Sequence, residues 1–391
     1  MTSALHIPTA KITPPRIGVP LLRRDRLLSE VQRGMSCKLL VISAEAGYGK
    51  TSLLLSALPD APLPVAWLTL DESDADPHLF SAALVAALRV VVQDFGSQVL
   101  DILTSGPTLL ELRRALFSAL DALPETVIVL DDFHTVANHP ETVRLVQEVL
   151  ASLPPSLHLV IAGRTPPPLP SIARLLVQGQ AVVLHSNKLR FSDSETAAFL
   201  RTSHGLDLAE PVLRRLAQRT EGWPAALQLI ALGVRTRGLT DADVTPPELY
   251  AYLASAVLKA LDAEIRGFLL RTAILTELWP SICRVVAPEA DPETMLAEIE
   301  RRNLFLYRLD DVEPRYRYHH LFAEFLRRRL QEESGAAAVT RLHGDAARHL
   351  ESVGILDEAV RHYFAAGALD EAERAMKPLH GDRLTARLAY T

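Results

Sequence analysis

The fold of this chain is decided by residues 39–55, which read Leu39-Leu40-Val41-Ile42-Ser43-Ala44-Glu45-Ala46-Gly47-Tyr48-Gly49-Lys50-Thr51-Ser52-Leu53-Leu54-Leu55. The stretch begins as a short apolar run typical of a buried strand, passes through a loop of small residues, and continues as an apolar segment compatible with a helix. A strand, a loop ending in Gly-Lys-Thr and a helix form the pattern of a phosphate-binding loop. The alternative is a chance glycine-rich turn with a surface lysine, and the flanking strand and helix argue against it.

The residue types in this loop suit the phosphates of a nucleotide. Loop amides and the N-terminus of the following helix point toward an anion, and the helix dipole favours its negative charge. Glycines let the backbone approach closely, Lys50 can reach the β- and γ-phosphates, and the Thr51 hydroxyl can bind Mg²⁺. Ala44 replaces the first glycine of the pattern and restricts φ, so we expect that turn to be built slightly differently. The predicted nucleotide-binding residues of the loop are Ala46, Gly47, Tyr48, Gly49, Lys50, Thr51 and Ser52.

Two carboxylates follow another apolar run, residues 126–130, which we predict to be a buried parallel strand. Ligands of open α/β sheets bind outside the carboxyl ends of the strands, at the same edge as the phosphate loop. Asp131 can there hold Mg²⁺ through water, and Asp132 is placed to polarise an attacking water. A strand that ends in Asp-Asp is also compatible with a simple capped turn, and the phosphate loop upstream favours the functional interpretation.

A third apolar run, residues 157–162, ends in Gly163-Arg164. An arginine at this edge can contact a γ-phosphate and report its presence, and a solvent-facing arginine is an equally good interpretation of Arg164. Two more strands are expected at residues 65–70 and 181–184, with helices between the strands. The order of elements predicts an α/β P-loop NTPase domain, a parallel sheet with helices on both faces.

The periodicity becomes helical from Ser192 onward, where Ser192-Asp193-Ser194-Glu195 is a capping-box start. This change predicts a separate all-α domain, and the helices followed by two short strands further along the chain predict a winged-helix arrangement. The sequence Gly354-Ile355-Leu356-Asp357-Glu358-Ala359 recurs thirteen residues later from Gly367, which indicates the start of an α-solenoid. The expected domains are a lead (1–35), a P-loop NTPase domain (36–187), an all-α domain (188–245), a winged-helix domain (246–333) and helical repeats (334–391).

Local elements are predicted in the same way. Leu21 to Leu28 has the spacing of an amphipathic helix. Further helices are expected at residues 76–92, 109–123, 211–219, 224–234, 247–261, 263–272, 292–302 and 319–330. A hairpin is expected from residues 303–308 and 315–318.

Composition limits the class of protein. The 391 residues suggest two to three domains, and 48% hydrophobic with 23% charged residues is an ordinary globular composition. A net charge of −6 argues against a basic nucleic-acid surface over the whole chain. The two cysteines have no metal-ligand spacing and form no disulfide framework. With neither a signal peptide nor a membrane span in the pattern, a cytoplasmic protein without a membrane partner is expected.

The motifs as a set resemble the nucleotide-switch portion of the STAND ATPases, and most of all the MalT-type, large ATP-binding LuxR-family transcription regulators. The resemblance covers residues 10–375. It rests on Ala44–Ser52, Ala66-Trp67-Leu68-Thr69-Leu70-Asp71-Glu72 with Asp76-Pro77, Asp131-Asp132, Gly163-Arg164, Gly222-Trp223-Pro224-Ala225-Ala226-Leu227-Gln228-Leu229, and Arg317-Tyr318-His319 with Leu321-Phe322 and Phe325-Leu326.

The resemblance implies ATP/ADP and Mg²⁺ as cofactors. It also implies an adenine-side segment in the first of the expected domains, a helical lid in the third and TPR-like repeats in the last. It implies that Pro224 packs near the adenine, that Arg164 senses the γ-phosphate, and that His319 touches the β-phosphate of bound ADP. The segment from Ile17 to Leu21, with Val19 and Leu21 as its predicted contacts, is similar to the stretch that lines the adenine in this family. ADP would hold a closed monomer, and ATP with an inducer bound to the helical repeats would permit assembly into a homo-oligomer.

Family members are typically longer and end in a DNA-binding helix-turn-helix, whereas this chain stops at Thr391, as a fragment or a natural short form would. DNA binding is therefore expected only with such an additional C-terminal domain. The first functional hypothesis is an ATP/ADP switch of a transcription regulator, with weak, slow ATP hydrolysis coupled to conformational change and self-association. A turnover enzyme, either a P-loop ATPase or a kinase, stays open, although no kinase catalytic-loop signature is present. A DNA-binding winged-helix protein is the third hypothesis, and its basic run Arg327-Arg328-Arg329 is more typical of a solvated face.

Overall fold

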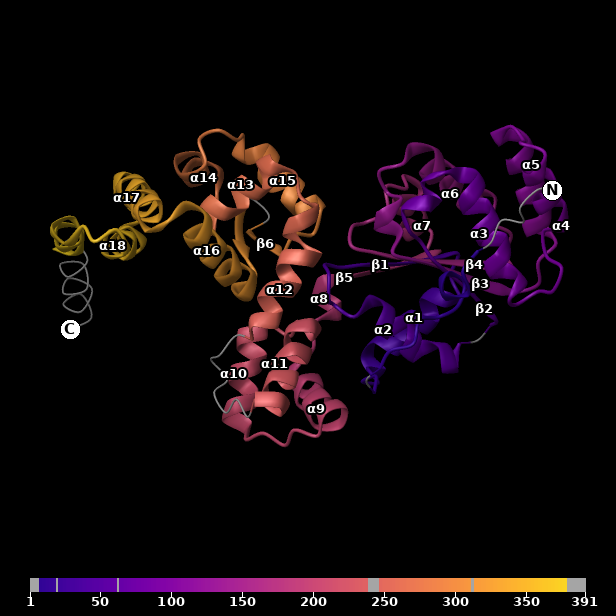
Figure 1. Ribbon diagram of the computed structural model, residues 1–391, viewed down its shortest axis with the longest axis horizontal. Helices are drawn as coiled ribbons and strands as arrows, with labels where there is room; N and C mark the ends of the chain where they lie inside the picture. Colours follow the sequence, from indigo (N-terminus) through magenta and orange to yellow (C-terminus); the bar gives the residue numbers. More distant parts are fainter. Residues whose placement is uncertain (1–6, 19, 62, 238–245, 311–312, 378–391) are drawn as a thin grey trace. The chain divides into compact units, whose positions relative to one another are not determined.

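The computed structural model describes residues 7–18, 20–61, 63–237, 246–310 and 313–377 (Figure 1). The chain divides into two compact units, Met1–Val244 and Thr245–Thr391. Among the described residues, no helix combines the length and the apolar character that crossing a bilayer requires.

The centre of the first unit is a five-stranded parallel sheet in the order β2-β3-β4-β1-β5. Its strands are β1 (Leu39–Ser43), β2 (Val65–Thr69), β3 (Thr126–Asp131), β4 (Leu157–Gly163) and β5 (Ala181–His185). Strands covered on both faces need continuous apolar runs, which is why the sequence predicted all five. The register pairs Ser43 with Gly163 and Thr69 with Asp131, so the carboxyl ends of these strands form one edge of the sheet.

Helices cover both faces of this sheet, as predicted (Figure 1). One face packs against α1 (Asp25–Met35) and α2 (Lys50–Ala57). The other face carries a hydrophobic core to which apolar side chains of the helices between the strands contribute. These helices are α3 (Pro77–Arg89), α4 (Ser97–Thr104), α5 (Leu109–Asp121), α6 (Pro140–Ser152) and α7 (Ser171–Val177).

Two local predictions need correction. The helix predicted from Leu21 begins only at Asp25: residues 21–24 have no regular secondary structure, and Leu22 packs against an apolar cluster formed by helices within residues 193–237. The helix predicted at 76–92 ends at Arg89, and the helices α4, α6 and α7 were not predicted.

The second part of this unit is helical, with α8 (Ser186–Leu189), α9 (Asp193–His204), α10 (Glu210–Thr220) and α11 (Pro224–Arg237). The predicted capping box is confirmed: the Ser192 hydroxyl accepts from the Glu195 amide at 3.1 Å, and the Ser192 amide donates to the Glu195 carboxylate at 2.9 Å. Helices α9, α10 and α11 share a small core that includes Leu200, Leu216 and Leu227.

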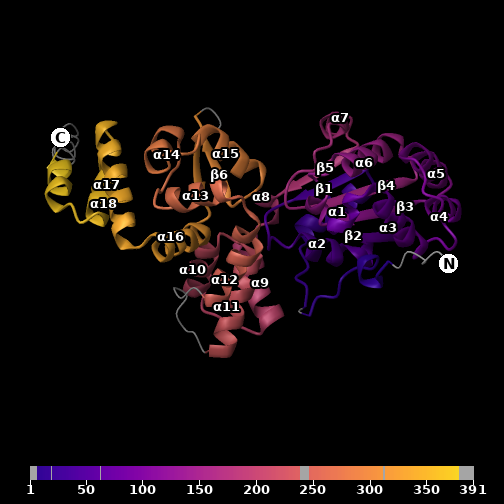
Figure 2. The same ribbon diagram turned by 45° about the horizontal axis from the view of Figure 1, so that its top comes forward.

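The second unit begins with helices and a hairpin, which Figure 2 shows from another side. Its elements are α12 (Pro247–Ala256), α13 (Ala263–Thr272), α14 (Pro280–Val286), α15 (Pro292–Arg301), β6 (Leu306–Asp310), β7 (Arg315–Tyr318) and α16 (His320–Ser334). The predicted hairpin is present, with β6 starting later than expected at Leu306. The helix expected at 247–261 ends at Ala256, and α14 was not predicted.

Two packed helices, α17 (Ala336–Ser352) and α18 (Leu356–Ala365), follow, and residues 369–377 are helical as well. The glycines of the predicted repeat occupy equivalent places, since Gly354 follows α17 and Gly367 follows α18, both in the left-handed region with φ of 81° and 69°. Left-handed glycine is a common end of a helix.

Candidate nucleotide-binding site

The phosphate loop connects β1 to α2 at the carboxyl edge of the sheet. Gly47 and Gly49 have φ of 78° and 76°, a region that favours glycine over any residue with a Cβ. Ala44 is fully buried and is not among the residues with positive φ, so an alanine fits there without strain. Its amide donates to the Gly163 carbonyl at 3.2 Å, which ties the start of the loop to the end of β4.

Lys50 lies at the start of α2 with its amine turned back into the loop. Nζ donates to the carbonyl oxygens of Ala44 at 2.7 Å and Glu45 at 3.0 Å. Burial lowers the pKa of Lys50 to about 8, and the negative charges of Asp132 and Asp131 act against that shift. The charge of Arg164 acts on the same amine, so the predicted residues at the ends of β3 and β4 lie near Lys50.

Thr51 and Asp131, the two predicted metal ligands, lie side by side. The Thr51 hydroxyl donates to Asp131 Oδ2 at 2.9 Å. Both side chains carry oxygen atoms, which Mg²⁺ prefers as ligands, so Thr51 could bind the cation directly and Asp131 could hold it through water. Burial, together with the charge of Asp132, raises the pKa of Asp131 to about 6.

Asp132 is the N-cap of a single 3₁₀ turn and lies in the left-handed region, with φ of 56° and ψ of 36°. Aspartate tolerates this conformation better than most residues with a Cβ. The amide of Asp132 donates to Asp131 Oδ1 at 3.0 Å, which orients the neighbouring carboxylate. His134 lies close by, with Nδ1 3.7 Å from Asp132 Oδ1, and burial with the charges of Arg164 and Lys50 lowers its pKa to about 3. Its ring is therefore neutral beside the candidate site at ordinary pH.

The turn before α11 is hydrogen-bonded to the phosphate loop. The indole N–H of Trp223 donates to the Ala46 carbonyl at 3.1 Å, and the amide of Ala225 donates to the Gly47 carbonyl at 3.0 Å. Pro224 lies between these two donors, and the Trp223 side chain is fully buried. The sequence explained this turn only by a helix end and a helix start, so it missed the contact with the loop.

A cavity of about 370 Å³ opens beside the loop and the lid helices. Five predicted nucleotide-binding residues line it: Leu21, Gly47, Gly49, Ser52 and Pro224. Apolar side chains such as Ile17, Leu22, Phe191 and Phe199 form most of the remaining wall. The predicted contact Val19 lies outside the described residues.

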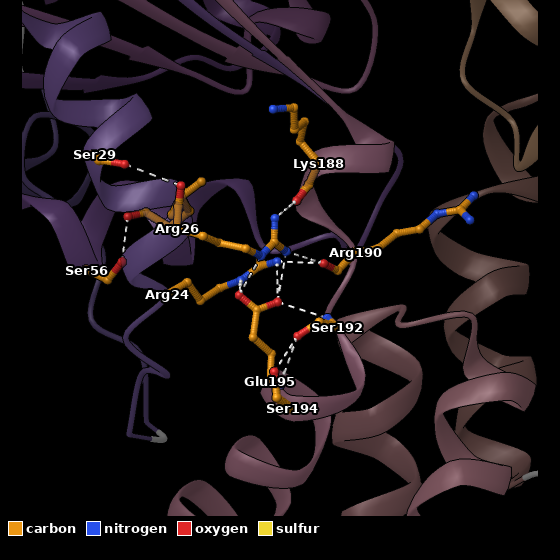
Figure 3. Close-up of polar contacts among 10 residues, drawn as sticks. Arg24, Arg26, Ser29, Ser56, Lys188, Arg190, Ser192, Ser194 and Glu195 are labelled. Carbon is orange, nitrogen blue, oxygen red and sulfur yellow. Dashed lines mark hydrogen bonds and ion pairs between the residues drawn. The ribbon is translucent and has the colours of Figure 1, made fainter.

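The segment that lines the cavity is connected to the start of the lid by charged groups (Figure 3). Arg24 donates to both oxygens of Glu195, at 3.1 and 3.2 Å, and Arg26 donates to the same carboxylate at 2.9 and 2.8 Å. Both guanidinium groups also donate to the carbonyl of Arg190. Burial alone would raise the pKa of Glu195, but the hydrogen bonds from Arg26 and Arg24 outweigh it and hold the pKa below its usual value. The sequence predicted a capping box that includes Glu195, but no sequence pattern predicted that Arg24 and Arg26 would pair with this carboxylate.

His319, the remaining predicted site residue, belongs to the second unit. It is the N-cap of α16, where its Nδ1 accepts from the amide of Leu321 at 3.2 Å, and its side chain is fully buried. A structural role at the start of this helix accounts for these contacts.

The sequence-family model of the MalT winged helix domain matches residues 254–338 of this chain. The HTH-type transcriptional regulator MalT of Yersinia enterocolitica is 33% identical over 365 residues, which are 90% of this chain and 40% of that protein. The MalT of Cronobacter sakazakii is also 33% identical, over the same shares of the two chains. This chain therefore spans about 40% of the length of the curated relatives that it matches.

Among solved structures, the Walker-type ATPase PABY2304 of Pyrococcus abyssi is similar in fold. The match has a TM-score of 0.58 with 16% sequence identity, and it covers 78% of this chain and 96% of that chain. At this identity the likeness bears on the fold alone. It confirms the predicted P-loop ATPase architecture, and the family match confirms the predicted winged helix.

Proposed function

We propose that the first unit of this chain binds ATP and ADP and acts as the nucleotide switch of a regulator. The premise is that the chain is a homologue of the MalT-type transcription regulators over the part of them that it spans. The observation that carries the proposal is the arrangement at one edge of the sheet. There, a left-handed glycine loop, the Lys50 amine and the Thr51–Asp131 pair adjoin an apolar cavity of about 370 Å³. Phosphates would bind at the loop and a purine in the cavity.

The chain's own groups have defined tasks in this proposal. Lys50 would leave the carbonyl oxygens of Ala44 and Glu45 and bind the β- and γ-phosphates, whose negative charge restores its full protonation. Thr51 and Asp131 would hold Mg²⁺, which neutralises charge on the phosphates when it is bound. Asp132 would orient water for slow hydrolysis, and Arg164 would contact the γ-phosphate. The contact of His319 with the β-phosphate stays a prediction from the family resemblance.

The switch would work through the lid. Trp223 and Ala225 donate to carbonyl groups of the phosphate loop itself, so a loop that rearranges around a third phosphate must rearrange these two bonds. A ligand shifts a conformational equilibrium only through its different affinity for the two states. ADP would favour the closed state, and ATP the state that self-associates.

The partners follow from the same proposal. An inducer or partner protein would bind the helical repeats, and DNA binding would need a further domain. The relatives are transcription regulators by name, so a cytoplasmic location is proposed as well. The basic run 327–329 does not favour DNA binding by this winged helix, because Arg327 donates to the Ala273 carbonyl and the next two arginines pair with Glu332.

The test is to identify the nucleotide that the purified chain carries, after acid release and chromatography. We expect about one ADP per chain, none in Lys50→Ala, and an unchanged content in Lys188→Ala, which removes an exposed lysine paired with Glu30. A nucleotide-free wild-type preparation that also fails to bind added ATP would contradict the proposal. Turnover above about 1 s⁻¹ without any partner would instead favour a working ATPase, since kinases run at about 1–100 s⁻¹.

A further inference from the structure

The lining of the cavity is poor in side chains that can form hydrogen bonds. Among the described residues that line it, only Arg24, Ser52 and Gln228 have such side chains. The guanidinium of Arg24 donates to Glu195 and to the Arg190 carbonyl, and Ser52 belongs to the first turn of α2 beside the phosphate loop. Gln228 is therefore the side chain best placed to contact the polar edge of a bound base.

Gln228 has a defined position and orientation. It follows Pro224 by one turn of α11, so both residues lie on the same face of the helix, and both line the cavity. Its Oε1 is 2.8 Å from Nε2 of His204, at the end of α9. His204 is itself buried and packs edge-on against Phe199, with ring centroids 4.9 Å apart. With Oε1 accepting from the imidazole N–H, the Gln228 amide NH₂ remains as a donor group.

We propose that Gln228, oriented by His204, reads the edge of the nucleobase and selects adenine over guanine; this rests on the proposed nucleotide binding. Adenine presents ring nitrogens that accept a hydrogen bond from an amide NH₂. Guanine carries N–H donors at N1 and N2, which a donor amide and an apolar wall cannot satisfy. A buried donor without a partner is costly, so the discrimination comes mainly from what guanine would leave unpaired. We expect ATP to bind about tenfold to a hundredfold more tightly than GTP.

The discriminating variant is Gln228→Glu in the full chain. The carboxylate accepts hydrogen bonds where the amide donates, so it repels the ring nitrogens of adenine and suits the N1 and N2 donors of guanine. We expect the ratio of ATP to GTP affinity, measured by titration calorimetry in excess Mg²⁺, to fall at least about tenfold. The matched control is Gln218→Glu, which makes the same change on the exposed side of α10 and should leave the ratio unchanged.

A second variant tests the same role in case Gln228→Glu does not fold. Gln228→Leu removes the donor without adding charge. It should weaken the binding of ATP about fivefold to tenfold and change the affinity for GTP by less than about threefold. Thermal unfolding of each variant shows whether it is folded, and a merely structural role of Gln228 would weaken both nucleotides alike.

The outcomes separate this inference from the function on which it depends. If folded Gln228→Glu or Gln228→Leu kept the wild-type ratio of ATP to GTP affinity, the base-reading role would be wrong while nucleotide binding stood. If wild-type protein bound neither ATP nor GTP, the proposed function itself would fall.

Discussion

The indole N–H of Trp223 donates a hydrogen bond of 3.1 Å to the carbonyl oxygen of Ala46, a residue 177 positions earlier in the chain. The bond joins the turn before α11 to the centre of the phosphate loop. A buried tryptophan normally finds a partner for its N–H, and here the partner is part of the candidate binding site. The lid and the loop are therefore coupled through one side chain.

Replacing Trp223 by phenylalanine should keep an aromatic ring in the core but remove this bond. The Ala46 carbonyl then loses its partner, and the smaller ring leaves space, so we expect a loss of about 1–3 kcal/mol in the free energy of unfolding. Nucleotide exchange should become faster, because the loop is held less firmly. Urea unfolding and the release rate of a fluorescent ADP analogue measure the two effects.

Trp279→Phe is the matched control for this prediction. The indole of Trp279 donates to the Ser281 hydroxyl at an exposed place in the second unit. It should cost less stability and leave nucleotide release unchanged. Equal release rates in Trp223→Phe and wild-type protein would show that the bond does not restrain the loop.

Asp131→Asn should stabilise the nucleotide-free protein in a pH-dependent way. The folded-state pKa of Asp131, about 6, lies above the ordinary 3.8, so the contribution of the neutral carboxyl to stability is complete below pH 3.8 and is lost as the pH rises through about 6. Asparagine stays neutral throughout. The gain from the substitution should therefore grow between about pH 4 and 6 and level off at about 2–3 kcal/mol above that.

Denaturant unfolding at pH 5 and pH 8 measures this difference, with Asp121→Asn, on the exposed surface at the end of α5, as the control. The same substitution should weaken Mg²⁺-dependent nucleotide binding, because an amide is a poorer ligand for the cation than a carboxylate. A gain in stability that is equal at both pH values would contradict the assignment of the raised pKa.

Gly222→Ala should be among the most destabilising single-methyl changes in the lid. A Cβ at this position would lie 2.3 Å from the carbonyl oxygen and 2.9 Å from the amide nitrogen of Phe191, so the backbone has to move. The two residues are also hydrogen-bonded, since the Phe191 amide donates to the Gly222 carbonyl at 2.8 Å.

Gly205→Ala separates the clash from the backbone strain. Its φ of 67° is close to the 69° of Gly222, but nothing lies within 4 Å of the added Cβ. The control, Gly205→Ala, should lower the free energy of unfolding by about 1–2 kcal/mol. Gly222→Ala should lower it by at least about 3 kcal/mol more. Equal unfolding midpoints for the two variants would mean that the lid relaxes around the methyl group.

Glu195→Ala should destabilise the first unit strongly. The Arg24 side chain is only 5% exposed, and removal of its carboxylate partner leaves a buried charge uncompensated. The substitution also removes one half of the capping box of α9. We expect a loss of about 3–5 kcal/mol in the free energy of unfolding.

The control for this prediction is Glu30→Ala, which breaks the more exposed pair with Lys188 and should cost less than about 1 kcal/mol. Unfolding in denaturant measures both. A loss as small as that of Glu30→Ala would show that the two arginines find water or other partners when the carboxylate is gone.

Local sequence patterns were sufficient for the sheet and for the phosphate loop. Each strand is a continuous apolar run because both faces of the sheet are covered, and the register then brings Asp131 and Gly163 to the edge where β1 ends. The grouping of the candidate residues around Lys50 could thus be predicted. Their roles with bound nucleotide stay predictions.

The contacts that tie the lid to the loop could not be predicted in this way. The partners of Trp223 and Glu195 lie about 170 residues away, and no periodicity links such distant positions. The absence of a helix at residues 21–24 was missed for the same reason. The leucines of this segment have helical spacing, but Leu22 packs against the lid, and this tertiary contact overrides the local preference.

The carboxylate of Glu195, which Arg24 and Arg26 share, also bears on how the protein folds during its synthesis. Arg24 leaves the ribosome 171 residues before the glutamate that neutralises it, a delay on the order of ten seconds at typical rates of translation. During that time the Arg24 guanidinium lacks its carboxylate partner, and the cavity between this segment and α9 cannot form. A truncated product that ends before α9 would therefore keep the ion pairs of Lys11 and Arg23 but leave the Arg24 charge without a carboxylate.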